Sequence, residues 1–94
     1  MAITVKFVGA FRHFSGIGEL DLDFEDKNSI GDLMTALIKE LPEIESSLID
    51  QYAQNSSPNA LILVNGREIG VLAGVDTILK DGDEVVLVPV VHGG

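Results

Sequence analysis

The stretch D-G-D-E-V-V-L-V-P-V-V-H-G-G, from Asp81 to Gly94, decides the fold. It opens with Asp81-Gly82-Asp83, which has the composition of a tight turn. The following segment, Glu84 to Val88, is apolar at positions that point to both sides of a strand, so we place it in the middle of a sheet. Pro89 cannot donate to a β-ladder, and we therefore expect residues 90–94 to leave the sheet as an extended arm.

Two segments near the N-terminus alternate apolar and polar residues with the period of two that is typical of strands. Their apolar positions are Ile3, Val5 and Phe7 in the first segment and Leu20, Leu22 and Phe24 in the second. The glycine-rich stretch from Gly9 to Gly18 has the composition of a loop. We therefore expect an antiparallel hairpin with a long connection.

The clearest helix lies between Ser29 and Pro42, where apolar residues recur at i, i+3, i+4, i+7, i+8 and i+11. Ser29 is placed to cap its first turn, and Asp32 can complete a capping box. Pro42 cannot continue the helix. The apolar stripe consists of Ile30, Leu33, Met34, Leu37, Ile38 and Leu41.

The next segments are shorter. Ile44, Leu48 and Tyr52 follow a spacing of four that suggests a second short helix, and residues 54–59 have loop composition. Ala60 to Val64 is a continuous apolar run, which predicts a strand covered on both faces. Asn65-Gly66 predicts a hairpin turn into a short edge strand at residues 67–69.

This order of elements indicates an α+β fold, the β-grasp or ubiquitin-like roll, with a mixed sheet of about five strands packed on one main helix. The first and last strands should lie parallel and adjacent. We assign residues 1–89 to this domain and residues 90–94 to its diglycine tail.

The amino-acid composition excludes several classes of functional site and partner. The chain has 94 residues, no cysteine, and six Lys and Arg against fifteen Asp and Glu, a net charge of −9. Disulfides, thiolate metal sites and cysteine nucleophiles are excluded. The acidic charge disfavours nucleic acid as a partner; it either steers the chain to a protein with a basic surface or serves solubility alone. With no signal-peptide pattern and no apolar stretch long enough to cross a membrane, we expect a cytoplasmic protein.

Side chains capable of chemistry are sparse. The two histidines are His13 and His92. No spacing of His, Asp and Glu in the sequence suits a zinc site, and no Ser or Thr has an identifiable base for nucleophilic catalysis. Gly16-Ile17-Gly18 lacks the Lys-Ser/Thr of a phosphate loop. Three carboxylates share one strand face, where a solvated surface is favoured over a cation site. These are Asp21, Asp23 and Glu25.

The tail itself is the remaining candidate. Glycine has no Cβ, so Gly93 and Gly94 would let a partner's backbone close around the arm. The reactive group would be the α-carboxylate of Gly94, with Val91, His92 and Gly93 bound in the partner's channel.

On two stretches, V-K-F-V-G-A-F-R-H-F-S-G (Val5 to Gly16) and the closing Asp81 to Gly94, the chain resembles the small sulfur-carrier subunit of molybdopterin synthase. The family often has aromatic residues and an alanine where this chain has Leu87, Val88 and His92. The H-G-G ending is similar to the ubiquitin-related modifier family.

The resemblance implies that a ubiquitin-activating-type enzyme adenylates Gly94 with ATP and Mg²⁺, and that sulfur then converts the glycine to a thiocarboxylate. The large synthase subunit would receive the tail, and sulfur would pass to a pterin precursor. The chain would bind no cofactor itself and would be a cosubstrate, not a catalyst alone. We expect Val88 and Val90, at the base of the tail, to contact the partner protein. We expect the same of Arg12, which lies in the loop that carries the resemblance.

Three functions stay open at this point. The chain is a sulfur carrier for molybdopterin synthesis, a ubiquitin-like modifier conjugated to lysines through Gly94, or a non-conjugating β-grasp interaction domain.

Overall fold

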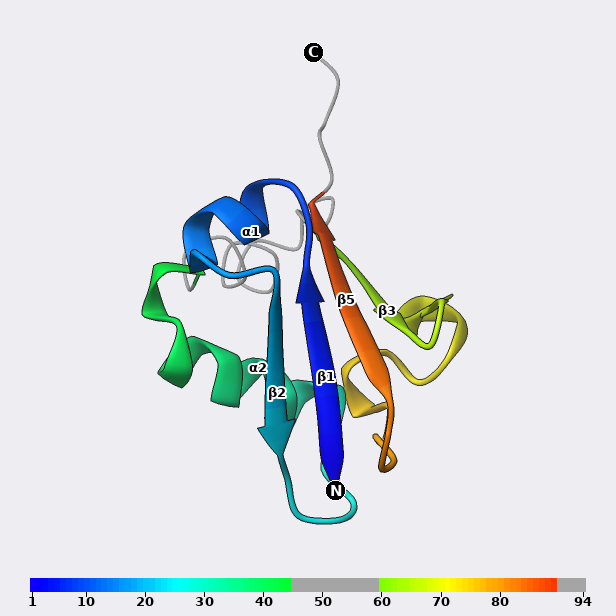
Figure 1. Ribbon diagram of the computed structural model, residues 1–94. Helices are drawn as coiled ribbons and strands as arrows, with labels where there is room; N and C mark the ends of the chain where they lie inside the picture. The colour runs from blue at the N-terminus through cyan, green and yellow to red at the C-terminus, as the bar shows by residue number, and fades with distance from the viewer. Residues whose placement is uncertain (45–59, 90–94) are drawn as a thin grey trace.

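The computed structural model describes residues 1–44 and 60–89, drawn in colour in Figure 1. The described strands form one five-stranded sheet, and α2 packs on one of its faces (Figure 1). The elements in chain order are β1 (Ala2–Phe7), α1 (Ala10–Ser15), β2 (Glu19–Asp23), α2 (Ile30–Glu40), η1 (Pro42–Ile44), β3 (Ala60–Val64), β4 (Arg67–Glu68), η2 (Ile69–Val71), η3 (Gly74–Asp76) and β5 (Glu84–Pro89).

The strand order is β2-β1-β5-β3-β4. Strand β1 pairs in parallel with β5, from Thr4 opposite Glu84 to Phe7 opposite Leu87. The other neighbours are antiparallel. The predicted central position of the last strand and its parallel pairing with the first strand are both confirmed.

Helix α2 follows its sequence pattern closely. The Ser29 hydroxyl accepts a hydrogen bond from the Asp32 backbone N–H at 3.2 Å, and the Asp32 carboxylate accepts one from the Ser29 N–H at 2.8 Å. This confirms the capping box, which satisfies N–H groups that have no partner within the helix. Ile30, Leu33, Met34 and Leu37 are buried against the sheet, and Ile38 and Leu41 pack at the edge of the core.

The prediction for residues 9–18 was wrong, because this stretch contains the helix α1. Gly9, with φ 56°, turns the chain out of β1, and Gly16, with φ 77°, ends the helix in the left-handed conformation. Phe11 is only 2% exposed. Burial of the Phe11 side chain anchors a helix that is too short to show a period.

The prediction that β3 is covered on both faces was also wrong. Ala60, Ile62 and Val64 are buried, whereas Leu61 is 38% exposed. Strand β5 shows the same asymmetry, since Val85 and Leu87 are buried and Val88 is half-buried. Within the described residues α2 covers only one face of the sheet, so the other face keeps apolar side chains in partial contact with solvent.

The predicted turns are confirmed, with φ 51° at Asn65, 85° at Gly66 and 85° at Gly82. The edge strand is shorter than expected, because Ile69 leaves β4 to begin η2. Of the second predicted helix only Ile44 is described, as the end of η1. Leu48, Tyr52 and the loop at 54–59 lie outside the described residues.

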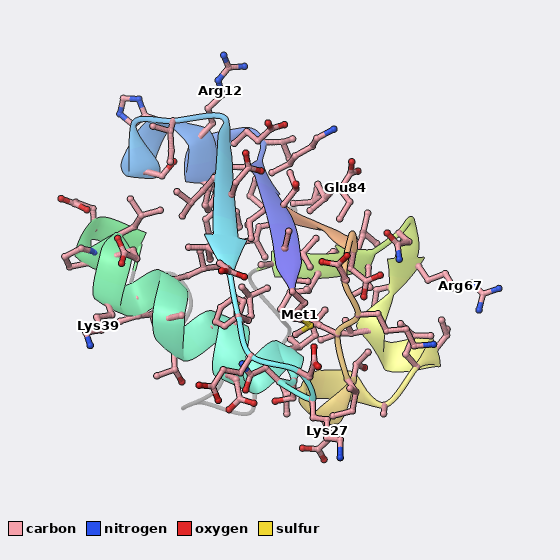
Figure 2. All side chains as sticks on the ribbon, turned by 60° about the horizontal axis from the view of Figure 1, so that its bottom comes forward. Met1, Arg12, Lys27, Lys39, Arg67 and Glu84 are labelled. Atoms are coloured by element: carbon pink, nitrogen blue, oxygen red, sulfur yellow. The ribbon has the colours of Figure 1, made fainter. Side chains whose placement is uncertain are left out.

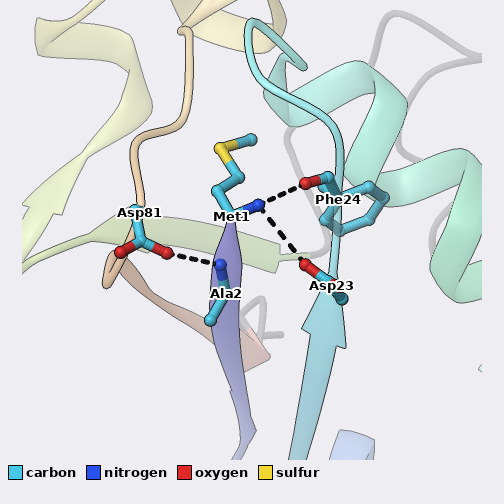
Figure 3. A network of polar contacts seen from close by, with 5 residues as sticks. All are labelled: Met1, Ala2, Asp23, Phe24 and Asp81. Atoms are coloured by element: carbon cyan, nitrogen blue, oxygen red, sulfur yellow. Dashed lines mark hydrogen bonds and ion pairs between the residues drawn. The ribbon is translucent and has the colours of Figure 1, made fainter.

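The N-terminus closes one end of the sheet (Figure 3). The Met1 ammonium group donates to the Phe24 carbonyl and lies 3.3 Å from a carboxylate oxygen of Asp23. The Ala2 N–H donates to Asp81 at 2.7 Å. The turn before β5 is therefore tied to the start of β1, at the end of the sheet opposite to where β5 ends (Figure 1).

Candidate functional site

The candidate site lies where β1 and β5 both end. Because these strands are parallel, their carboxyl ends meet at one edge of the domain, next to α1 (Figure 1). The ladder continues one residue past β1, where the Val8 N–H donates to the Leu87 carbonyl at 3.3 Å. Pro89 is the last residue of β5 and pairs with Ala60 of β3. The base of the tail is thus held by strands on both sides.

Gly9 and Pro89 are packed against each other at this end. A Cβ atom built on Gly9 would lie 2.9 Å from Cγ of Pro89, closer than Cβ atoms in proteins come to non-bonded heavy atoms. Only a glycine lets the proline ring sit here, and the positive φ of Gly9 gives a second reason for the residue. This contact packs the last residue of β5 against the end of β1.

The face of the sheet away from α2 is apolar on one half. Leu61 on β3 lies opposite Val88 on β5, and Leu63 lies opposite Val86. Val8, just past β1, is 39% exposed at the same end of the sheet. We call these five residues, Val8, Leu61, Leu63, Val86 and Val88, the tail-root patch. Such a partly exposed cluster is typical of a protein contact surface.

The other half of the same face is acidic. Glu19, Asp21 and Asp23 of β2 are exposed, and the Asp21 carboxylate accepts a hydrogen bond from the Thr4 hydroxyl at 2.9 Å. Between the two halves Lys6 Nζ lies 3.0 Å from Glu84 Oε2. The hydrogen bond to Glu84 and the charge of that carboxylate raise the pKa of Lys6.

Arg12 is exposed on α1, and its side chain passes over Gly18, where a Cβ atom would lie 3.4 Å from Nε. Figure 2 shows its guanidinium directed away from the body of the domain. Helix α1 contacts β5. The structure therefore brings two of the residues proposed from sequence, Arg12 and Val88, to the same end of the molecule.

The remaining predicted site residues, Val90, Val91, His92, Gly93 and Gly94, lie outside the described residues. Sequence reasoning missed Leu61 and the Gly9–Pro89 contact. The position of Leu61 between Ala60 and Ile62 could have indicated its exposure. Neighbouring residues of a strand face opposite sides of the sheet, so Leu61 faces away from the side that Ala60 and Ile62 share.

In the part of the chain that the structure describes, no three His, Asp or Glu side chains are placed to hold a metal ion. Asp81 and Asp83 bind backbone and amide N–H groups, as turn residues do. No helix within residues 1–44 and 60–89 has the length and hydropathy needed to span a membrane.

The sequence was compared with protein families and with known proteins. Residues 5–94 match the family model of the ThiS family. The chain is 32% identical over 94 residues to small archaeal modifier protein 3 from Haloferax volcanii. It is 33% identical over 99 residues to the sulfur carrier protein CysO from Mycobacterium tuberculosis. Both alignments cover 100% of this chain and 100% of the relative.

Solved structures agree with the fold. Small archaeal modifier protein 1 from Methanosarcina acetivorans has a TM-score of 0.80 at 30% identity, over 99% of this chain and 96% of that one. Urm1 from Trypanosoma brucei has a TM-score of 0.77 at 33% identity, over 99% and 95%. A chain of the complex of subunits 1 and 2 of the Helicobacter pylori molybdopterin-converting factor has a TM-score of 0.64 at 23% identity, over 100% of both chains, which shows the fold alone. These neighbours are ubiquitin-like, so the β-grasp prediction is confirmed.

Proposed function

Because the chain belongs to the ThiS family, we propose that it is a sulfur carrier that bears sulfur on its C-terminal glycine, Gly94, as a thiocarboxylate. The observation that carries this proposal is the end of β5. That strand is central in the sheet, its last residue is seated on Gly9, and it ends five residues before Gly94. A thin arm on such a rigid base can enter another protein's channel while the domain stays outside.

The chemistry needs activation, because a carboxylate is a poor electrophile. In the proposed sequence the Gly94 carboxylate attacks the α-phosphorus of ATP, and pyrophosphate leaves. A persulfide of the activating machinery then attacks the acyl carbon and displaces AMP, which gives an acyl disulfide. A thiol of the same machinery next attacks the donor's sulfur in that disulfide, so that a new disulfide forms and the Gly94 thiocarboxylate leaves. ATP and Mg²⁺ are bound by a ubiquitin-activating-type enzyme, and this chain acts as its cosubstrate.

The tail-root patch and the acidic strand β2 are proposed to dock that enzyme. The patch offers apolar surface beside the tail, and Glu19, Asp21 and Asp23 offer negative charge on the same face. A partner with an apolar centre and a basic rim would match both halves. Arg12 is proposed to make a polar contact at the edge of this interface.

We further propose that the sulfur serves molybdopterin synthesis, in which the chain is the small subunit of the synthase and the large subunit receives its tail. Support comes from the resemblance of Val5 to Gly16 and of Asp81 to Gly94 to that family. The fold shared with the molybdopterin-converting factor chain is compatible with the same role.

A second candidate is a protein modifier conjugated to lysines through Gly94. The observation that favours it is the likeness to small archaeal modifier protein 3 and to Urm1, together with the H-G-G ending. The same activation step precedes both fates, so they diverge only in what attacks the activated glycine.

Intact-mass spectrometry of the full chain, incubated with the adenylating enzyme, Mg-ATP and a sulfur donor, tests these alternatives. A sulfur carrier gains the mass difference of one oxygen-to-sulfur exchange, localised to Gly94. A modifier gives branched adducts on lysines of other proteins. The variant Gly94→Glu is the control and should give neither. If the native chain also gives neither, it is a non-conjugating interaction domain. Co-purification with a large synthase subunit then tests the molybdopterin pathway.

A further inference from the structure

A second exposed apolar surface lies away from the tail. Six large apolar side chains are exposed in the described parts of the chain, and four of them fall within residues 71–78. Their exposed fractions are 76% for Val71, 36% for Leu72, 38% for Val75 and 53% for Ile78. This segment follows β4, at the edge of the sheet opposite to β2 (Figure 1). Apolar side chains concentrated in this way on a small domain indicate a contact surface.

A hollow of about 370 Å³ opens beside this segment. Leu72 and Ile78 line it on the apolar side, and Arg67 and Lys80 line it as cations. We call these four residues the second patch. Val75 lines a different hollow with residues of α2 and is not part of it.

The two cations of the second patch are not paired with the one carboxylate that lines the same hollow. Asp83 also lines the hollow, but one of its carboxylate oxygens accepts from the Asn65 side-chain amide and the other from the Lys80 backbone N–H, each at 2.8 Å. Neither Arg67 nor Lys80 forms an ion pair with any residue in 1–44 or 60–89. Figure 2 shows Arg67 extending away from the domain.

Local hydrogen bonds hold this surface in place. The Ile30 N–H donates to the Thr77 carbonyl at 2.9 Å, and the Leu79 N–H donates to the Asn28 carbonyl at 2.9 Å, on either side of Ile78. The side chain of Leu79, the next residue, is buried in the core and anchors this segment. Ile78 is therefore exposed to solvent on a backbone that is already held in place. This lowers the entropic cost of ordering the surface when a partner binds.

The lining of this hollow carries two cations and one carboxylate, whereas the molecule as a whole is strongly acidic. The chain has a net charge of −9 and only six Lys and Arg residues, and two of these six flank the hollow. The tail-root patch, by contrast, shares its face of the sheet with the acidic residues of β2. The two apolar surfaces therefore suit partners of opposite charge.

We propose that the second patch is a docking site for an acidic amphipathic segment of another protein. An apolar side chain of that segment contacts Leu72 and Ile78, and its carboxylates pair with Arg67 and Lys80. Because the second patch is remote from the end of β5, such a partner can stay bound while the tail is engaged elsewhere. The proposal does not depend on sulfur transfer.

Selection of random peptides displayed on phage against the full-length chain tests this site, followed by NMR titration of the selected peptides with ¹⁵N-labelled protein. We expect the selected peptides to combine one or two large apolar residues with several Asp or Glu. We expect them to shift amide signals of residues 64–67 and 72–83. The double variant Arg67→Glu/Lys80→Glu should weaken their binding at least about tenfold, as the loss of central charged contacts does in other interfaces.

The matched control is Lys27→Glu/Lys39→Glu, which changes the net charge by the same amount at two other exposed lysines. This control should bind as the native chain does. The proposal is overturned by equal weakening in both double variants, by selected peptides that are basic or neutral, by signals that shift only around Leu61 and Val88, or by no selection at all. Self-association in sedimentation that Arg67→Glu/Lys80→Glu abolishes would also overturn it, since a second copy would then be the occupant.

Discussion

Pro89, the last residue of β5, is packed directly on Gly9, the residue that turns the chain from β1 into α1. This contact joins the base of the tail to the first strand across the parallel β1–β5 pair. Any side chain on Gly9 must displace the proline ring, because a Cβ there would lie 2.9 Å from Pro89 Cγ.

We predict that Gly9→Ala lowers the free energy of unfolding by about 2–4 kcal/mol. About 1–3 kcal/mol comes from placing alanine at φ 56° and ψ −132°, a sparsely populated backbone region, and the rest from the collision with Pro89. Urea denaturation measures the total. Gly66→Ala is the control, since Gly66 also has positive φ but no atom within 4 Å of its added Cβ. Equal losses in the two variants would show that the proline contact contributes nothing.

The capping box gives a second stability prediction. Ser29→Ala removes the hydroxyl that accepts from the Asp32 N–H, so we expect α2 and the domain to lose about 1 kcal/mol. Thermal and urea unfolding measure this loss. Thr35→Ala on the same helix is the control, because the exposed Thr35 hydroxyl only donates to the Gly31 carbonyl within the helix. A loss for Thr35→Ala as large as for Ser29→Ala would mean that capping is not the cause.

Sequence patterns predicted the parts of the fold whose signal is local. The stripe of α2 spans three turns, its cap is read from Ser29 and Asp32, and Asn65-Gly66 defines a turn almost alone. Helix α1 has six residues, fewer than two turns, which is too short for its apolar residues to show a helical period. The glycines at its two ends gave the stretch the composition of a loop. Its existence depends on burial of Phe11, which is a tertiary effect.

The candidate site was predictable only in part, for a related reason. A continuous apolar strand such as Ala60 to Val64 does not reveal how many layers cover its sheet. The exposure of Leu61 follows from a single covering helix, and its pairing with Val88 follows from register. The contact of Gly9 with Pro89 joins residues eighty positions apart, and no spacing rule reports it.

The Lys6–Glu84 ion pair predicts a pH dependence. Its lysine pKa is raised in the folded state, so the folded protein holds this proton more tightly than the unfolded chain. The stabilisation by the pair is therefore complete below the ordinary lysine pKa of 10.5 and is lost as the pH rises through the raised value. We expect the difference in unfolding free energy between the native chain and Lys6→Met to be constant from neutral to weakly alkaline pH. It should fall above pH 10.5. A difference that stays constant through this range would exclude the pair as its source.

Leu61 gives the sharpest test of the tail-root patch. Leu61→Asp should slow formation of the proposed thiocarboxylate on Gly94 by about tenfold or more, because a charge would be placed in the apolar centre of the proposed interface. Val75→Asp is a matched control, since both side chains are 38% exposed and Val75 lies outside both the tail-root patch and the second patch. Circular dichroism and urea unfolding should show both variants folded. Similar slowing by the two variants, or none by Leu61→Asp, would place the activating enzyme elsewhere.

The acidic half of the same face predicts how fast the chain associates with the proposed activating enzyme. Glu19, Asp21 and Asp23 are exposed on the same face of the sheet as the tail-root patch, so we expect them to speed association with a basic partner. Raising the salt concentration shortens the screening distance from about 10 Å at 0.1 M to about 3 Å at 1 M, and the association rate should fall accordingly while dissociation changes little. Stopped-flow binding to the adenylating enzyme measures both rates. The triple variant Glu19→Gln/Asp21→Asn/Asp23→Asn should bind more slowly at low salt and lose most of the salt dependence. If the triple variant keeps the native salt slope, the steering charges lie elsewhere on the molecule, and β2 is only a solvated edge of the sheet.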